Sequence, residues 1–359
     1  MNRNIKEDIC YYLLVSCLIG MTCNSCKQDS ATAVYHSVSG ETMGTTYECK
    51  FSAEPKYDIY KPQIDSLLEL INAVASTYIP NSEVSLFNQA ETSHCTDEDS
   101  PKSFHLRALM EISASVNKNS DGYFDPTMMP LVNYWGFGYE KRDEKLFVDT
   151  NAINDMMSYI GYNKVAVENQ NDKYCLTKSH QLTQLDFSAV AKGYAVDMIA
   201  TYLSQYGIDD YYINIGGEVV VKGHSPKEKP WTLGINYPDT TAQLNEIYAF
   251  VELTHGSMAT SGNYRNFYQK GAQAFAHTIN PKTGMAVPSD LLSATVLAEN
   301  CALADAYATA FMAMGFERAQ AKLKKLDEVE AFFIYYDDKK EMLHHYTSTN
   351  LKSKLRIAK

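Results

Sequence analysis

An aspartate and a threonine lie four residues apart in SATVLAENCALADAYATAFMAMG, positions 293–315. The segment predicts a strand followed by a helix of small residues, and this spacing places Asp305 and Thr309 on one helix face. A carboxylate and a hydroxyl are hard oxygen ligands suited to Mg²⁺, which usually completes six coordination with phosphates and waters. The pair therefore indicates a magnesium site, and the alternative is an ordinary polar pair on a helix surface.

A second set of polar residues opens a helix in LDFSAVAKGYAVDMIATYL, positions 185–203. Asp186 precedes the helix, and Lys192 and Gly193 lie in its early turns. A helix N-terminus with a nearby lysine suits a phosphate group. The segment is not a Walker loop, because the required glycine spacing before the lysine is absent, and a plain amphipathic helix is the alternative.

Hydroxyls, a cation and an imidazole occur together in MATSGNYRNFY, positions 258–268, and AFAHTINPKTGMAV, positions 274–287. Thr260, Ser261 and Arg265 can bind phosphate, and His277 can transfer a proton. A single histidine is often only a structural hydrogen-bonding residue. The turn at 280–284 that follows His277 favours the functional interpretation.

Aromatic residues and turn formers alternate in DGYFDPTMMPLVNYWGFG, positions 121–138. Such a loop can line a site for a flat ligand such as an isoalloxazine or adenine ring. The alternative is a buried loop in which Asp125 only fixes a turn. In GETMGTTYECKF, positions 40–51, Gly40 and Gly44 flank Met43 and permit close backbone approach to a ligand, or simply a turn into an edge strand.

The elements that must position these residues alternate irregularly between helix and strand. Helices are expected from Pro62, over 104–116, over 152–160 and from Ser188 to Gly207, on the basis of apolar periodicity and capping residues. Strand patterns cover 164–167, 211–221, 231–236, 248–253, 293–298 and 331–336. Within 211–223, Gly216 and Gly217 indicate a bulge or a tight backbone passage. The pattern predicts an α+β fold.

Composition is that of a folded protein with an acidic surface. The chain has 359 residues, 45% hydrophobic and 21% charged, and a formal net charge of -11 at pH 7. A length of this order suits one large domain. Because the sequence shows no Lys/Arg clusters of the kind that bind a phosphate backbone, nucleic acid is an unsuitable partner.

The first 26 residues read as an export signal. Arg3 and Lys6 precede an apolar stretch, roughly 9–21, that is too short for a comfortable membrane span. The nearby cysteines resemble a bacterial lipoprotein signal, with the lipidated residue left open among Cys17, Cys23 and Cys26. A disulfide or zinc site at the CxxC pair is the alternative.

Three regions are therefore expected: a signal peptide at 1–26, a polar tether at 27–38 and a catalytic domain at 39–359. The four cysteines of this domain, at positions 49, 95, 175 and 301, are widely spaced and do not suggest a disulfide framework. The expected location is the cell envelope, lipid-anchored to a bacterial membrane and facing the periplasm.

Taken together and in this order, the motifs closely resemble the ApbE-like FAD:protein FMN transferase family, from about Gly40 to the C-terminal strands. The resemblance implies a single large mixed α/β domain of the ApbE type, related to the T-fold, with a central FAD cleft. A further matching segment is STYIPNSEVSLFN, positions 76–88, in which the aromatic Tyr78 suggests a transferase rather than a plain FAD hydrolase. Asn280 departs from the family pattern, which more often has aspartate before the proline.

The resemblance also assigns site residues. FAD would be contacted by Met43, Tyr78, Tyr123, Phe124, Asp125, Asp186, Lys192 and Ile279. Mg²⁺ would be held by Asp305, Thr309 and the backbone carbonyl of Ala189, and His277 would accept the proton of the acceptor hydroxyl. Lys192 and Arg265 are candidates for stabilising charge, although Arg265 can instead support its loop.

The implied reaction is Mg²⁺-dependent transfer of FMN from FAD, the substrate, to a threonine or serine of an acceptor protein, with release of AMP. The expected acceptor is a flavin-carrying subunit of an envelope redox complex. Three alternatives stay open: a Mg²⁺-dependent FAD pyrophosphatase giving FMN and AMP, a non-catalytic flavin-binding lipoprotein, and a glycan-binding surface lipoprotein.

Overall fold

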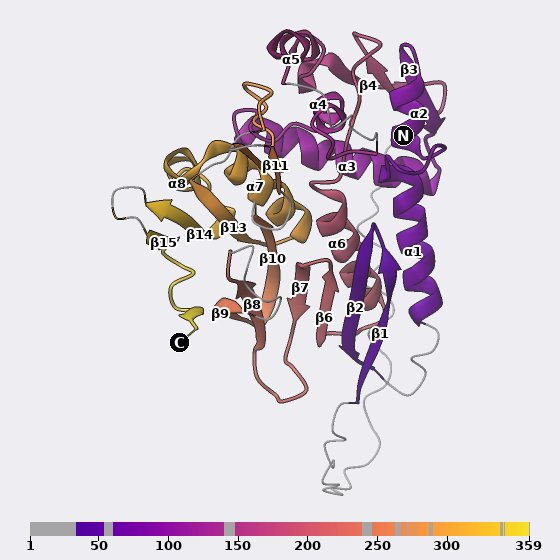
Figure 1. Cartoon of the computed structure of the whole chain (residues 1–359). Coiled ribbons are helices and arrows are strands. Elements are labelled where there is room, and N and C mark those ends of the chain that lie inside the picture. Colours follow the sequence, from indigo (N-terminus) through magenta and orange to yellow (C-terminus); the bar gives the residue numbers. More distant parts are fainter. Residues whose placement is uncertain are drawn as a thin grey trace, which may run out of the picture. The chain divides into compact units, whose positions relative to one another are not determined.

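An eight-stranded antiparallel sheet organises the chain (Figure 1). The computed structural model describes residues 34–53, 60–139, 148–238, 246–262, 267–270, 273–276, 278–286, 290–337, 340 and 342–358, with the backbone alone for 267–276. In spatial order the strands are β1 (Tyr35–Thr42), β2 (Thr45–Ser52), β6 (Tyr211–Ile215), β7 (Glu218–Lys222), β10 (His255–Gly262), β13 (Leu291–Ala298), β14 (Val329–Asp337) and β15 (Met342–Thr347).

Three smaller sheets accompany the large one. The first contains β16 (Leu355–Ile357), β9 (Ile247–Leu253) and β8 (Trp231–Asn236), and the second contains β3 (Ser93–Asp97), β5 (Lys173–Lys178) and β4 (Val165–Gln170). The third is the hairpin of β11 (Phe267–Lys270) and β12 (Gln273–Ala276).

Eight α-helices and one short 3₁₀ helix are present in the described part of the chain. They are α1 (Tyr60–Ala75), α2 (Glu83–Gln89), α3 (Pro101–Asn119), α4 (Met129–Tyr134), α5 (Thr150–Met157), η2 (Tyr162–Lys164), α6 (Ala191–Gln205), α7 (Cys301–Met314) and α8 (Phe316–Leu323). Helix α7 packs on β10 and β13, and α6 packs on α7. None of the helices described has the length and apolarity needed to cross a bilayer.

The large sheet is apolar on both faces and therefore contributes to two cores. Because successive side chains of a strand point to opposite faces, Val220 and Phe333 join the large core under the helices, whereas Val219 and Phe332 join a second core. The second core is completed by β8 and β9 of the first small sheet. A third, smaller core forms around α4 and α5.

Close packing of α6 against α7 depends on small residues. A Cβ atom at Gly193 would lie 2.3 Å from the carbonyl oxygen of Cys301, so only glycine fits without a shift of the backbone. The N-terminus of α7 is capped by Asn300, and Asp197 of α6 accepts the amides of Cys301 and Ala302 at 2.7 and 2.8 Å. These contacts fix the two helices that carry Lys192 and Asp305.

Several predicted elements match the structure closely, and others need correction. β8 occupies 231–236 as expected. The single strand expected over 211–221 is instead the hairpin of β6 and β7, because Gly216 and Gly217 adopt positive φ values of 65° and 116° and turn the chain back. β1 begins at Tyr35, inside the range expected for a tether, because it pairs with β2.

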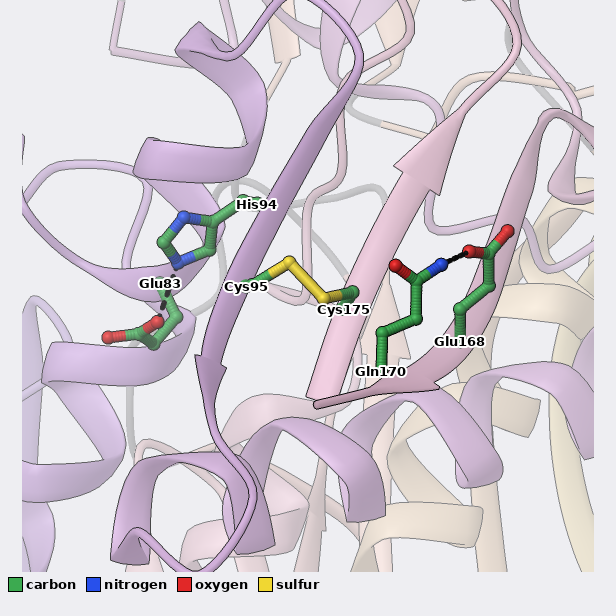
Figure 2. Close-up of a disulfide and its surroundings, with 6 residues drawn as sticks. All are labelled: Glu83, His94, Cys95, Glu168, Gln170 and Cys175. Atoms are coloured by element: carbon green, nitrogen blue, oxygen red, sulfur yellow. Dashed lines mark hydrogen bonds and ion pairs between the residues drawn. A yellow bond between two sulfur atoms is a disulfide. The ribbon is translucent and has the colours of Figure 1, made fainter. Parts of the chain in front are cut away.

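The expectation that the domain cysteines would not form a disulfide framework is wrong for Cys95 and Cys175, which are bonded to each other (Figure 2). They lie directly opposite each other on β3 and β5, with Cα atoms 4.1 Å apart. Their separation of 80 residues gave no sign of this pairing. Cys49 and Cys301 are buried free thiols.

Candidate active site

A cavity of about 450 Å³ brings together most of the predicted site residues. Its walls come from the loop at 121–138, the segment before α6, the strands β7 and β10, the turn at 278–281 and helix α7. The predicted residues that line it are Tyr78, Tyr123, Phe124, Asp125, Asp186, Ala189, Lys192, Ile279, Asp305 and Thr309. Motifs far apart in the sequence therefore share one site.

One lysine and two carboxylates meet on the wall formed by α6, β7 and α7. The ammonium of Lys192 lies 2.6 Å from Oε1 of Glu218 and 3.8 Å from Oδ2 of Asp305. The same Asp305 oxygen accepts the backbone amide of Gly193 at 3.1 Å. Oε2 of Glu218 is buried and has no hydrogen-bond partner among the described residues.

The electrostatics of this group centre on one ammonium that lies beside two buried carboxyl groups. Burial lowers the pKa of Lys192, but the charges of Asp305 and Glu218 outweigh it, so that the pKa is raised and the ammonium stays charged. Burial raises the pKa of Glu218, Asp305 adds to this effect, and Lys192 opposes it. Two buried carboxylates thus share one cation, an arrangement that a second cation would stabilise.

Hydroxyl groups continue this polar wall. Thr309 lies one turn after Asp305 on α7, and its Oγ1 is 3.3 Å from Oγ of Ser261 on β10. The neighbouring Thr260 hydroxyl is 2.8 Å from that of Thr295. Together with the backbone of Ala189, these residues supply the oxygen atoms to which a hard divalent cation binds.

Asp125 holds the aromatic loop in shape. Its Oδ1 accepts the backbone amide and the hydroxyl of Thr127 at 2.9 and 2.7 Å, and its Oδ2 accepts the amide of Tyr162 at 3.2 Å. Burial raises the pKa of Asp125, although these hydrogen bonds and the charge of Lys282 oppose the effect. The turn-fixing role considered from the sequence is therefore present, and the residue also lines the cavity.

Asp186 connects the segment before α6 to the same loop. Its carboxylate accepts the amide and the hydroxyl of Ser188 at 2.8 and 2.9 Å. Its backbone amide donates to the carbonyl of Pro126 at 2.7 Å. Burial raises the pKa of Asp186 despite the bonds from Ser188.

Aromatic rings stand at the outer part of the cavity. Tyr78 is 69% exposed and makes an edge contact with Tyr139 at a centroid distance of 6.3 Å. Lys282 places its ammonium 5.6 Å from the ring centroid of Tyr123. Phe124 is buried beneath them and joins the large core. A flat ligand could therefore contact several rings at this end of the cavity.

Of the remaining predicted residues, the structure describes Met43 and leaves two others undescribed. Met43 occupies the turn between β1 and β2 with a φ of 50° and packs against the large core rather than lining the cavity. Its position follows from the hairpin, since Met43 and Gly44 form the turn. His277 and Arg265 lie outside the described residues.

Glu218 is the main site residue that sequence reasoning missed. It is 4% exposed and faces the cavity from the first position of β7. The signal was present, because an acidic residue directly follows Gly216 and Gly217 and precedes three valines. A charged side chain at the start of an otherwise apolar strand, directly after a tight turn, indicates a carboxylate with a functional role.

Comparison with known proteins gives a consistent result. The ApbE family matches residues 43–333. A Haemophilus influenzae protein named FAD:protein FMN transferase is 33% identical over 310 residues, which cover 85% of this chain and 87% of that protein. A Vibrio cholerae protein of the same name is 33% identical over 318 residues, covering 88% and 91%.

Solved structures resemble the whole described fold. The flavin transferase ApbE from Vibrio cholerae has a TM-score of 0.79 and 32% identity, covering 90% of this chain and 99% of that one. The Pseudomonas stutzeri flavinyl transferase ApbE in its apo form has a TM-score of 0.77 and 27% identity, covering 91% and 98%.

Together with the fold and the cavity, the similarity to these proteins identifies an enzyme of the transferase class. The expected mixed α/β fold of the ApbE type is confirmed. The chain belongs to the ApbE family.

Proposed function

We propose that this enzyme transfers FMN from FAD to the hydroxyl of a threonine or serine in an acceptor protein, releasing AMP, in a Mg²⁺-dependent reaction. The observation that carries the proposal is the cavity itself, whose lining combines aromatic rings with an oxygen-rich wall where one lysine serves two carboxyl groups. An isoalloxazine ring suits the first, and a pyrophosphate bound through a divalent cation suits the second.

FAD is the proposed substrate and would bind in the cavity. In this proposal Tyr78, Tyr123 and Phe124 contact the rings of FAD, and the remaining contacts come from Asp125, Asp186, Lys192 and Ile279, all of which line the cavity. The charged ammonium of Lys192 offsets negative charge that develops on the phosphates. The contact predicted for Met43 remains a prediction.

The residues present fit a magnesium ion. Asp305, Thr309 and the carbonyl of Ala189 line one wall. Oε2 of Glu218 has no hydrogen-bond partner among the described residues, and Lys192 is shared between Glu218 and Asp305, so a further cation could be bound here. Once bound, Mg²⁺ would offset charge on the pyrophosphate of FAD and orient it for in-line attack.

The remaining steps belong to side chains of this enzyme. His277 is proposed to accept the proton of the acceptor hydroxyl as its oxygen attacks the FMN phosphorus. The bond from that phosphorus to the bridging oxygen breaks, and AMP leaves with the oxygen. The support for His277 is its motif and its position one residue before Thr278, a cavity residue.

The proposed location is the cell envelope, with the chain lipid-anchored through Cys17, Cys23 or Cys26 and facing the periplasm. The apolar N-terminal stretch supports export. The Cys95–Cys175 disulfide supports it independently, because disulfides persist in oxidising compartments and are rare in the cytosol. The acceptor proposed is a flavin-carrying subunit of an envelope redox complex.

The test is mass spectrometry of a threonine-bearing acceptor flavoprotein after incubation with the full chain in detergent, FAD and Mg²⁺. A covalent FMN adduct, lost when a chelator is added, is the expected result. Release of free FMN and AMP without an adduct, across several acceptors, would instead make the protein a FAD pyrophosphatase. Tight FAD binding without either product would leave a flavin-binding protein.

A further inference from the structure

The segment from Thr183 to Ala189 links β5 to α6 without being part of either element. It carries Asp186 and Ala189, and both line the cavity. Backbone groups in a largely buried segment outside regular structure must find hydrogen-bond partners elsewhere. Two side chains from outside the segment provide partners for the backbone groups of Leu185 and for the carbonyl of Thr183.

The first is Asn88, near the C-terminal end of α2. Its side chain is 8% exposed, donates to the carbonyl of Leu185 at 2.9 Å and accepts the Leu185 amide at 2.7 Å. One side-chain amide thus satisfies both backbone groups of the residue directly before Asp186, as a neighbouring strand would. Asparagine suits this task because it presents a donor and an acceptor together.

The second is Lys178, the last residue of β5. It is 7% exposed, and its ammonium donates to the carbonyls of Asn88 at 3.2 Å and Thr183 at 3.1 Å, with the Phe87 ring centroid 5.1 Å away. No carboxylate of the described residues forms an ion pair with it, and burial lowers its pKa to about 8. A buried ammonium without a carboxylate partner among the described residues is costly, which argues for a specific role.

The opposite side of the segment is attached to the aromatic loop. The Asp186 amide donates to Pro126 at 2.7 Å, and Gln184 forms a parallel bridge with Met128. The segment therefore lies between the aromatic loop and the pair Asn88 and Lys178, which we call the amide–ammonium clamp. Loss of the clamp would free one side of the segment while leaving the cavity residues themselves unchanged.

We propose that Asn88 and Lys178 are positioning residues that hold the Thr183–Ala189 segment, and thereby set the Asp186 side chain and the Ala189 carbonyl for FAD and its cation. This inference rests on the proposed function, since it concerns the same cavity. Neither clamp residue lines the cavity, so both act through the backbone that they bind.

The test combines two measurements on the full chain in detergent. Hydrogen exchange, followed by mass spectrometry without FAD or metal, reports how firmly the segment is held. Quenching of FAD fluorescence reports FAD affinity. The variants are Asn88→Ala, Lys178→Met and the milder Asn88→Asp, which keeps the acceptor for the Leu185 amide and loses the donor.

The matched control is Lys102→Met. Lys102 also contacts α2, through Glu83 at the other end of the helix, 2.9 Å from its Oε1. The same chemical change is thus made at another lysine that contacts α2, away from the segment. It separates loss of the clamp from a general weakening of α2.

The expected result is exchange at 183–189 about tenfold faster and FAD affinity about tenfold lower in Asn88→Ala and Lys178→Met, with smaller changes in Asn88→Asp and wild-type values in Lys102→Met. Unchanged exchange would overturn the proposal, and so would faster exchange with unchanged FAD affinity. If the wild-type chain binds no FAD, the proposed function fails, and exchange alone decides whether the clamp holds the segment.

Discussion

Two glutamates in this molecule are equally buried but differ in the number of partners that their carboxylate oxygens have. Glu83 and Glu218 are each 4% exposed. Glu83 has a partner for each oxygen. Nε2 of His94 lies at 2.7 Å (Figure 2), and Nζ of Lys102 lies at 2.9 Å. Glu218 shares one lysine with Asp305, and its second oxygen has no partner among the described residues.

The pKa values of the two glutamates shift in opposite directions for this reason. Burial alone would raise the pKa of Glu83, but hydrogen bonds from His94 and Lys102 outweigh it and lower the pKa. At Glu218 burial and the charge of Asp305 prevail over Lys192, and the pKa rises. The first carboxylate is fully paired and stabilises the fold, whereas the second lies in the cavity where a metal ion is proposed to bind.

The largest effect expected is on catalysis. Asp305→Ala should lower Mg²⁺-dependent FMN transfer by more than about a hundredfold, because the wall loses the carboxylate proposed as a cation ligand. The protein should stay folded, because removal of one carboxylate leaves Lys192 and Glu218 as a balanced pair. Adduct formation by mass spectrometry and the circular dichroism spectrum measure the two. A wild-type transfer rate in this variant would contradict the proposal that Asp305 binds the metal ion.

The matching change at the paired carboxylate should affect stability alone. Glu83→Gln is expected to lower the free energy of unfolding by about 1–3 kcal/mol, because two hydrogen bonds to charged groups are lost or weakened. Urea unfolding measures this, and FAD and metal affinity should remain at wild-type values. If Glu83→Gln left stability unaltered but weakened FAD binding, the assignment of Glu83 to fold stability alone would be wrong.

Glu218→Gln should show the reverse pattern. Metal affinity is expected to fall about tenfold, since the cavity loses one negative charge and Lys192 turns to Asp305. The free energy of unfolding should change by less than about 1 kcal/mol, because the neutral amide is easier to bury than the charge. Titration calorimetry with Mg²⁺ or Mn²⁺ gives the first value and urea unfolding the second. Undiminished metal affinity would contradict the role assigned to this wall.

The smallest effect is expected at a further, partly buried carboxylate, Asp197. Asp197 accepts two backbone amides without a lysine or arginine partner among its described contacts, and burial raises its pKa to about 7 despite these bonds. Between roughly pH 4 and pH 7 Asp197 therefore holds its proton more in the folded than in the unfolded state, so the contribution of this group to stability should fall as pH rises through this window.

Asp197→Asn should flatten that dependence, as urea midpoints at pH 4.5 and pH 7.5 would reveal. Asp155→Asn, at an exposed position of α5, is the control. An equally steep dependence in Asp197→Asn would assign the pH effect to other groups.

Local sequence signals predicted the helices of this fold better than its sheet connections. Spacing placed Asp305 and Thr309 on one face of α7, and both line the cavity. The pairing of β2 with β6, and of β3 with β5, joins residues far apart in the chain and left no local trace. The same limit hid the disulfide.

The site shows a similar division. Residues within a motif, such as Asp186 and Lys192, could be found because their neighbours indicated a helix start. Glu218 became visible only when the hairpin of β6 and β7 brought it to Lys192. Met43 lies away from the cavity because its turn belongs to the sheet edge.

The disulfide restricts the unfolded chain in one part of the cavity lining and not in another. The covalent loop from Cys95 to Cys175 contains the aromatic segment at 121–138, whereas Lys192, Glu218 and Asp305 lie outside it. In the oxidised unfolded chain, the loop restricts the segment at 121–138 and not these three residues, a constraint of roughly 4 kcal/mol for a closed loop of this length. Reduction would thus raise the entropic cost of ordering the segment at 121–138 during folding.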